Sequence, residues 1–167
     1  IRGVVAVLKK LKEKMKAKHK IAHMKSAFNY AECSTAQRLQ VGCVIVKDNR
    51  VISIGYNGMP SGWTNECENE VVEVPLDQAS LPENEIRSLV TKPEVLHAES
   101  NAICKLARSS ESGEDASAFV THQPCLDCAK LLYQSGITHV YYVHPYRLDH
   151  GLKFLKECGI HVEQMVV

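Results

Sequence analysis

The feature that most constrains the fold is a pair of short motifs whose side chains suit a zinc ion. Residues 97–99 read His-Ala-Glu, and residues 124–128 read Pro-Cys-Leu-Asp-Cys. Each motif follows irregular chain and begins a predicted helix. The spacing of Cys125 and Cys128 places both sulfurs on one side of a first helical turn. Together with His97, they predict a metal site with three protein ligands.

The number of ligands distinguishes a catalytic zinc from a structural one. Three protein ligands leave the fourth tetrahedral position for water, which can then ionise near neutral pH. Glu99 lies two residues from His97, close enough to carry a proton without binding the metal. A zinc knuckle is the alternative, but no fourth Cys or His lies at a matching short spacing. The pattern H-x-E with P-C-x-x-C is the known signature of the zinc deaminases, which favours catalysis.

Composition and cysteine usage indicate an intracellular globular protein. Hydrophobic residues make up 45% of the 167 residues, and no apolar run approaches the roughly 20 residues of a membrane span. The seven cysteines are odd in number and argue for reduced thiols. Residues 1–7 lack the order of a secretory signal. We therefore expect a cytoplasmic protein (in the host cytoplasm if the source is viral) with no membrane partner.

Charge divides the chain into a basic start and an acidic body. Residues 1–25 hold nine Lys or Arg against one Glu, a balance of +8, so the total of +1 leaves −7 for residues 26–167. We predict a basic N-terminal arm or helix over 1–25 and a single zinc-dependent deaminase domain over 26–167. A basic arm can contact nucleic acid or a membrane surface, or it can be a solvated helix face. The acidic body argues against a nucleic-acid substrate.

Hydrophobic periodicity predicts alternating helices and strands. Helices are expected at 9–32, 97–107, 125–134 and 151–158, and strands at 41–46, 51–56, 116–121, 137–143 and 160–167. A turn at 47–50 joins the first two strands into a hairpin. Residues 57–93 lack a regular pattern and predict a long loop or insertion, with a short helix near 83–90. Together these helices and strands predict a three-layer α/β/α domain on a mixed sheet of about five strands, of which the last two are parallel.

Four segments surround and extend the metal motifs. They are residues 41–46 (VGCVIV), 55–58 (GYNG), 97–103 (HAESNAI) and 120–128 (VTHQPCLDC). With them, the chain from about residue 24 to residue 167 resembles the phage and bacterial deoxycytidylate (dCMP) deaminases of the zinc-dependent cytidine deaminase superfamily. The metal motif is common to the superfamily, whereas GYNG and the continuation of HAE narrow the resemblance to this branch. The resemblance implies a cytidine-deaminase-like fold.

The resemblance also implies an activity, which is hydrolytic deamination of dCMP to dUMP and ammonia with a catalytic Zn²⁺. Activated water attacks C4 of cytosine, and Glu99 takes its proton, protonates N3 and delivers a proton to the departing ammonia. Allosteric activation by dCTP and inhibition by dTTP, with Mg²⁺, and a homo-oligomer, in relatives a hexamer, are implied as well. The alternatives are a deaminase of a nucleoside, a base or a tRNA adenosine, and a non-catalytic zinc-stabilised nucleotide-binding module. Glu99 argues against the last.

The resemblance implies that Asn57 and Arg38 are further substrate contacts, whereas Tyr146 is proposed from its place after a predicted strand; each has an ordinary structural alternative. Asn57, at a glycine-flanked turn, is expected to contact the sugar, or only to make a local turn hydrogen bond. Arg38 could pair with the 5′-phosphate, since guanidinium matches phosphate geometry, or be a surface arginine. Tyr146 could stack on the base or be a half-buried core tyrosine. Ala98, between His97 and Glu99, is included among the substrate contacts.

Regulatory candidates come from the same resemblance. The Gly-Tyr-Asn-Gly loop borders the effector site in relatives, which singles out Gly55, Tyr56 and Gly58. Arg108 matches an arginine near the subunit and effector region of relatives. An ordinary charge at a helix C-terminus explains Arg108 almost as well.

One departure from the family concerns a second metal. Many relatives bind a second zinc through a cysteine at the position of Ala36, together with other residues of the long loop. Cys33 and Cys67 lie only near that position here. The alanine therefore argues against a second zinc site.

Overall fold

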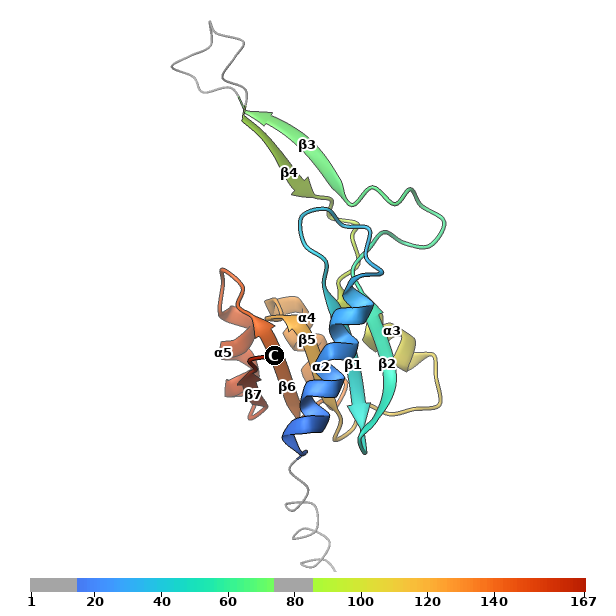
Figure 1. The fold of residues 1–167 in the computed structure, drawn as a ribbon, viewed down its shortest axis with the longest axis vertical. Coiled ribbons are helices and arrows are strands. Elements are labelled where there is room, and N and C mark those ends of the chain that lie inside the picture. Colours follow the sequence, from blue (N-terminus) through green and yellow to red (C-terminus); the bar gives the residue numbers. More distant parts are fainter. Residues whose placement is uncertain (1–14, 74–85) are drawn as a thin grey trace, which may run out of the picture.

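The computed structural model describes residues 15–73 and 86–167, which are built around a five-stranded mixed sheet (Figure 1). The strands lie in the order β2-β1-β5-β6-β7. Their bounds are Gly42–Lys47 (β1), Arg50–Tyr56 (β2), Ser117–His122 (β5), His139–His144 (β6) and His161–Gln164 (β7). The helices are α2 (Ala17–Ala31), α3 (Ala98–Ala107), α4 (Leu126–Gln134) and α5 (His150–Glu157).

The strand directions confirm the predicted mixed sheet. β1 runs antiparallel to both β2 and β5, whereas β5, β6 and β7 are parallel to one another. The β1–β2 turn is the predicted hairpin, with Asp48 and Asn49 at φ 51° and 60°. Two successive residues with positive φ are typical of the two-residue turn whose twist matches the flanking strands, and Asp and Asn tolerate this conformation.

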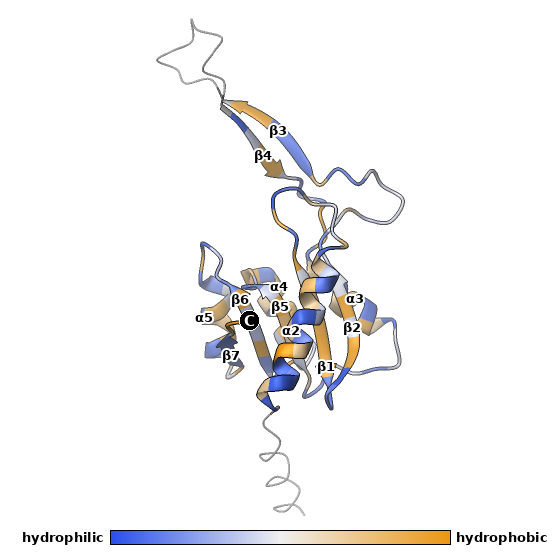
Figure 2. Cartoon of the chain, in the orientation of Figure 1, coloured by the Kyte–Doolittle hydropathy of each residue, from blue (hydrophilic) through white to orange (hydrophobic). Residues whose placement is uncertain are grey.

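Alternation along β1 explains why the fold has three layers. Cys43 and Ile45 point into a core shared with α3, α4 and α5, whereas Val44 and Val46 point into a second core under α2. Because successive strand residues face opposite sides, a strand covered on both faces must be apolar throughout. β1 is accordingly hydrophobic over most of its length (Figure 2). The predicted α/β/α arrangement is confirmed.

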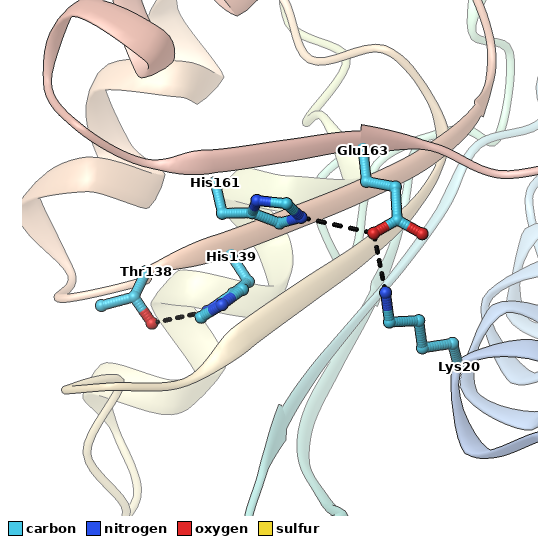
Figure 3. A network of polar contacts seen from close by, with 5 residues as sticks. All are labelled: Lys20, Thr138, His139, His161 and Glu163. Carbon is cyan, nitrogen blue, oxygen red and sulfur yellow. Dashed lines mark hydrogen bonds and ion pairs between the residues drawn. The ribbon is translucent and has the colours of Figure 1, made fainter. Parts of the chain in front are cut away.

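Helix α2 is tied to the far edge of the sheet by a buried lysine. Lys20 is 7% exposed, and its Nζ donates to Glu163 Oε2 on β7 at 2.7 Å (Figure 3). The same ammonium lies 4.4 Å from the centroid of the Tyr141 ring. Glu163 also contacts His161 Nε2 at 3.3 Å. The proposed boundary at residue 25 falls within α2, and residues 1–14 of the predicted basic arm lie outside the described residues.

The region 57–93 differs from its prediction. It contains a two-stranded antiparallel hairpin, here called the arm, of β3 (Glu68–Glu73) and β4 (Ile86–Thr91), which extends away from the central sheet (Figure 1). The short helix predicted near 83–90 is wrong over residues 86–90, which belong to β4; residues 83–85 lie outside the described residues. A strand at this place depends on pairing with β3, whose nearest register partner, Glu73, lies 13 positions before Ile86. Local hydrophobic periodicity carries no signal for such a pairing.

Smaller differences concern the ends of elements. β7 stops at Gln164, three residues before its predicted end, because its last register partner is Tyr142 on β6. Helix α2 begins at Ala17, and residues 9–14 of the predicted helix lie outside the described residues. None of the helices within the described ranges is long and apolar enough to cross a bilayer.

Candidate metal centre and active site

The sequence-predicted zinc ligands converge at the N-termini of two helices. His97 is the N-cap residue of α3 and Cys125 that of α4, both with extended backbone. Cys128 lies in the first turn of α4. N-caps in the extended conformation turn the chain sharply into each helix, so both motifs present their side chains where the helices begin. The dipoles of α3 and α4 favour negative charge at this place.

The distances fit a tetrahedral zinc ion. Nδ1 of His97 lies 3.6 Å from Cys125 Sγ and 3.4 Å from Cys128 Sγ, and the three ligand atoms lie within 4.8 Å of one another. Zn–S and Zn–N bonds of about 2.3 and 2.0 Å at tetrahedral angles would separate nitrogen from sulfur by about 3.5 Å. Within residues 15–73 and 86–167, this is the one cluster of three His, Cys, Asp or Glu side chains at such spacing. One imidazole and two thiols are therefore a suitable donor set.

The two sulfurs differ in charge. Hydrogen bonds from Cys128 and His97 lower the pKa of Cys125 to about 4, so Cys125 is a thiolate at neutral pH. The hydrogen bond to Cys125 and burial raise the pKa of Cys128. The hydrogen bond with Cys125 also raises the pKa of His97. The cluster thus carries one thiolate already, and a bound cation favours deprotonation of the second thiol.

Glu99 is buried beside the three candidate metal ligands. It is 4% exposed and occupies the first turn of α3. Burial raises its pKa to about 7, while hydrogen bonding, including one with Cys128, and the neighbouring His97 act in the opposite direction. A carboxyl group whose pKa is close to the working pH can both accept and donate a proton.

A cationic cleft of about 430 Å³ lies at the same edge of the sheet, where β5 and β6 end. It brings together Arg38 and Tyr146, which the sequence analysis proposed separately, with Arg147. His122 and His144, the last residues of β5 and β6, line the cleft as register partners. Burial and the neighbouring His144 lower the pKa of His122 to about 4, so its imidazole is neutral near pH 7. Only two residues, Gln123 and Pro124, separate His122 from Cys125.

Sequence reasoning missed the histidines, Arg147 and one bracing residue of this cleft. Gln123 is 6% exposed. Its Nε2 donates to Leu148 O at 2.7 Å, and its Oε1 accepts from Tyr146 N at 3.3 Å. This glutamine therefore holds the loop after β6 that carries Tyr146. Their position in the sequence could have indicated them, because they follow or end predicted strands, and ligands of α/β sheets bind beyond the carboxyl ends of parallel strands.

Asn57 uses its side-chain amide within the protein. Its Oδ1 accepts from Val41 N and its Nδ2 donates to Leu39 O, both at 2.8 Å. These bonds fix the segment that follows Arg38. The amide still has one N–H donor and one acceptor lone pair that could contact a sugar, so the predicted sugar contact stays a prediction. Ala98 is fully buried in the core shared by α3 and the sheet.

The regulatory candidates occupy different environments. A Cβ on Gly55 would lie within 2.6 Å of Ala102 N and closer still to Ala98 O, whereas a Cβ on Gly58 would meet nothing within 4 Å. The Tyr56 ring lies 5.3 Å from Lys105 Nζ, and Arg108 is the exposed C-cap of α3. Gly55 therefore has a packing function between β2 and α3, and an effector contact of any of these residues stays a prediction.

The residues near the second-zinc position form a small apolar cluster. Ala36 packs with Cys67 and Val95, all of them buried. Cys33 is exposed. The prediction about a second zinc stays untested.

Comparison with known proteins gives the family. The family model described as "Cytidine and deoxycytidylate deaminase zinc-binding region" matches residues 17–144. The chain therefore belongs to the family of cytidine and deoxycytidylate deaminases, as its motifs and its fold indicate.

Individual relatives narrow the comparison. The deoxycytidylate deaminase of Saccharomyces cerevisiae is 39% identical over 142 residues, which cover 84% of this chain and 43% of the yeast protein. ComE operon protein 2 of Bacillus subtilis is 33% identical over 133 residues, 79% of this chain and 63% of that protein. The chain thus spans about half the length of these curated relatives. Among solved structures, the dCMP deaminase of cyanophage S-TIM5 in complex with dCMP and dUMP superposes with a TM-score of 0.76 at 39% identity, covering 90% of this chain and 99% of that one.

Proposed function

We propose that this protein hydrolyses dCMP to dUMP and ammonia with a zinc ion as cofactor. The observation that carries the proposal is the convergence of His97, Cys125 and Cys128 beside the buried Glu99. Membership of the deaminase family supports the reaction class. Similarity to the cyanophage dCMP deaminase, whose structure contains dCMP and dUMP, supports the substrate.

The chain's own residues would hold the cofactor and move the protons. Zinc bound by His97, Cys125 and Cys128 would supply a water that ionises near neutral pH. Glu99 would accept the two protons of this water in turn, passing the first to N3 of cytosine and the second to the leaving amino group at C4. Oxygen replaces nitrogen at C4, and the products are dUMP and ammonia. The buried carboxyl, with its raised pKa, suits both directions of transfer.

The cationic cleft is proposed as the site of the nucleotide's 5′-phosphate. Arg38 and Arg147 line it, and a guanidinium group matches a phosphate with paired donors. The Tyr146 ring lies in the same cleft, in keeping with stacking on the base. His122 is neutral and can donate or accept a hydrogen bond without adding charge. The Asn57 contact with the sugar remains part of this proposal.

Allosteric control and assembly are proposed from the family resemblance. dCTP with Mg²⁺ would activate and dTTP with Mg²⁺ would inhibit through the loop of Tyr56 and Gly58, with Arg108 nearby in the effector region. The exposed position of Arg108 is compatible with a contact to a nucleotide or to another subunit. A homo-oligomer, a hexamer in the relatives, belongs to the same proposal.

Ammonia release from dCMP, cytidine and dCTP tests the proposal, each substrate alone and with dCTP–Mg²⁺ or dTTP–Mg²⁺. Preference for dCMP, raised by dCTP and lowered by dTTP, is the expected result. Turnover of cytidine alone would move the protein to a nucleoside-specific branch. Bound zinc without turnover of any of the three would contradict the proposed substrate.

A further inference from the structure

The segment that carries Arg38 has no regular secondary structure of its own. Residues 34–40 lie within the connection between α2 and β1, and Arg38 is exposed there. The base of the arm, where Glu68 pairs with Thr91, supplies hydrogen bonds that hold this segment. Glu68, the first residue of β3, accepts through Oε1 from both Gln37 N and Arg38 N at 3.2 Å. One carboxylate thus fixes the backbone on either side of the Gln37 Cα, immediately before Arg38.

The guanidinium of Arg38 is held by the opposite strand of the arm. Arg38 Nη1 donates to Thr91 Oγ1 at 2.9 Å. Thr91 and Glu68 are direct register partners in the hairpin, so their side chains lie on the same face. One cross-strand pair therefore contacts both the backbone and the side chain of Arg38.

The arm base is itself fixed to the segment by buried contacts. Cys67, immediately before β3, is fully buried with Ala36 and Val95. Its carbonyl accepts from Lys92 N at 2.9 Å, which closes the base of the hairpin. Cys67 Sγ also lies 3.5 Å from Thr35 Oγ1. The pair Glu68–Thr91 is therefore held at a constant place relative to residues 35–38.

We propose that Glu68 and Thr91 are positioning residues that hold Arg38 ready for the phosphate of the substrate. The inference rests on the proposed function of the cleft. An exposed arginine loses rotamer freedom when it binds an anion, and a guanidinium already oriented loses less. The bond to Thr91 occupies one of five N–H donors, which leaves the others for phosphate oxygens.

This arrangement acts on recognition and not on the chemical step. The two residues reach the site through Arg38, whereas the proton transfers belong to Glu99. Loss of the Thr91 hydroxyl should therefore raise KM for dCMP and leave kcat nearly unchanged. Deoxycytidine has no phosphate, so its kcat/KM should not respond.

The test compares three variants of the zinc-loaded enzyme. Thr91→Val removes the hydroxyl acceptor with little change in shape, whereas Thr91→Ser keeps a hydroxyl at the same place. Ser88→Ala is the control, because it removes a hydroxyl from the opposite face of the same strand. Thr91→Val should raise KM for dCMP by about three- to tenfold, as expected for one lost hydrogen bond. Thr91→Ser and Ser88→Ala should match the wild type. Equal KM in Thr91→Val and Ser88→Ala, or an equal loss with deoxycytidine, would overturn the inference.

A second measurement separates this inference from the proposed function. If the wild type releases no ammonia from dCMP, the proposed function fails, and the affinity of the same proteins for inorganic phosphate is then measured by calorimetry. Weaker phosphate binding by Thr91→Val alone supports the positioning of Arg38. Unchanged binding in Thr91→Val, or no phosphate binding by the wild type, refutes it. Melting temperatures close to the wild type show that each variant is folded.

Discussion

Replacing Gly55 with alanine should disturb the metal centre through packing alone. Gly55 lies on β2 and is buried against the first turns of α3. A Cβ there would approach Ala102 N to 2.6 Å, where ordinary contacts begin at 3.4 Å, and Ala98 O is closer still. Both partners are backbone atoms and cannot rotate away. Helix α3 must therefore retreat from the sheet, and His97 and Glu99 move with it.

The size of this effect follows from the distances. Restoring an ordinary contact to Ala102 N requires a shift of about 0.8 Å, the difference between 2.6 and 3.4 Å. Overpacking of this kind costs about 1–3 kcal/mol, which lowers the melting temperature of a chain this size by roughly 2–12 °C. Misplacing a catalytic group by about 1 Å can cost on the order of 100-fold in rate. We expect basal turnover of dCMP to fall by about 10- to 100-fold, with weaker zinc retention.

The assays are thermal unfolding, metal content after dialysis, and ammonia release without effectors. Gly58→Ala is the matched control, since its Cβ would meet no atom within 4 Å, and it should keep wild-type stability, zinc and basal turnover. The packing argument is refuted if Gly55→Ala behaves like Gly58→Ala in all three assays. Loss of the response to dCTP and dTTP with normal basal turnover would instead show that Gly55 acts at an effector site.

Two further substitutions test separate parts of the structure. Glu99→Ala should retain zinc and lose about 10²–10⁴-fold or more in turnover, because a proton-transfer group is removed. Metal analysis and ammonia release check this. Activity above about one per cent of the wild type would contradict the role of Glu99 as a proton shuttle. Glu163→Gln should lower the free energy of unfolding by about 1–2 kcal/mol at pH 7, because the buried Lys20 loses its charged partner. The hydrogen bond from Lys20 lowers the pKa of Glu163 below its usual 4.5, so the stabilisation is complete above that value and is lost as the pH falls below it. Urea unfolding at pH 7 and at pH 3 should therefore show a difference between Glu163→Gln and the wild type that shrinks in acid, and a constant difference would contradict the ion pair.

The central fold and the metal cluster could be predicted because local sequence determines both. The run 41–46 is apolar since β1 is covered on two faces, and the motifs at His97 and Cys125 each begin a helix. The arm could not be predicted in the same way. Glu68 pairs with Thr91 across more than twenty residues, and exposed strands do not show a hydrophobic pattern of period two.

The cleft was only half predicted for a related reason. Arg38 was proposed from the resemblance and Tyr146 from its place after a predicted strand, but the residues that hold them became visible only with tertiary contacts. Gln123 holds the loop of Tyr146, and Glu68 and Thr91 hold Arg38. Such bonds link segments far apart in the sequence, and polar residues of this kind have no distinctive spacing. Position at the carboxyl ends of β5 and β6 was the one general signal for the cleft.

The candidate metal centre and the cleft depend on different parts of the fold. The positions of His97 and Cys125 depend on α3 and α4, which pack in one core. Strand β2, which carries Gly55, packs against α3. Arg38 depends on the arm base, and Tyr146 depends on the loop after β6. Under the proposed function, changes in residues 34–40 or in the arm base can therefore alter phosphate recognition without moving His97, Cys125 or Cys128. A shift of α3, by contrast, must affect every substrate equally, with or without a phosphate. The ratio of dCMP to deoxycytidine turnover consequently distinguishes a defect in recognition from a defect in the metal centre.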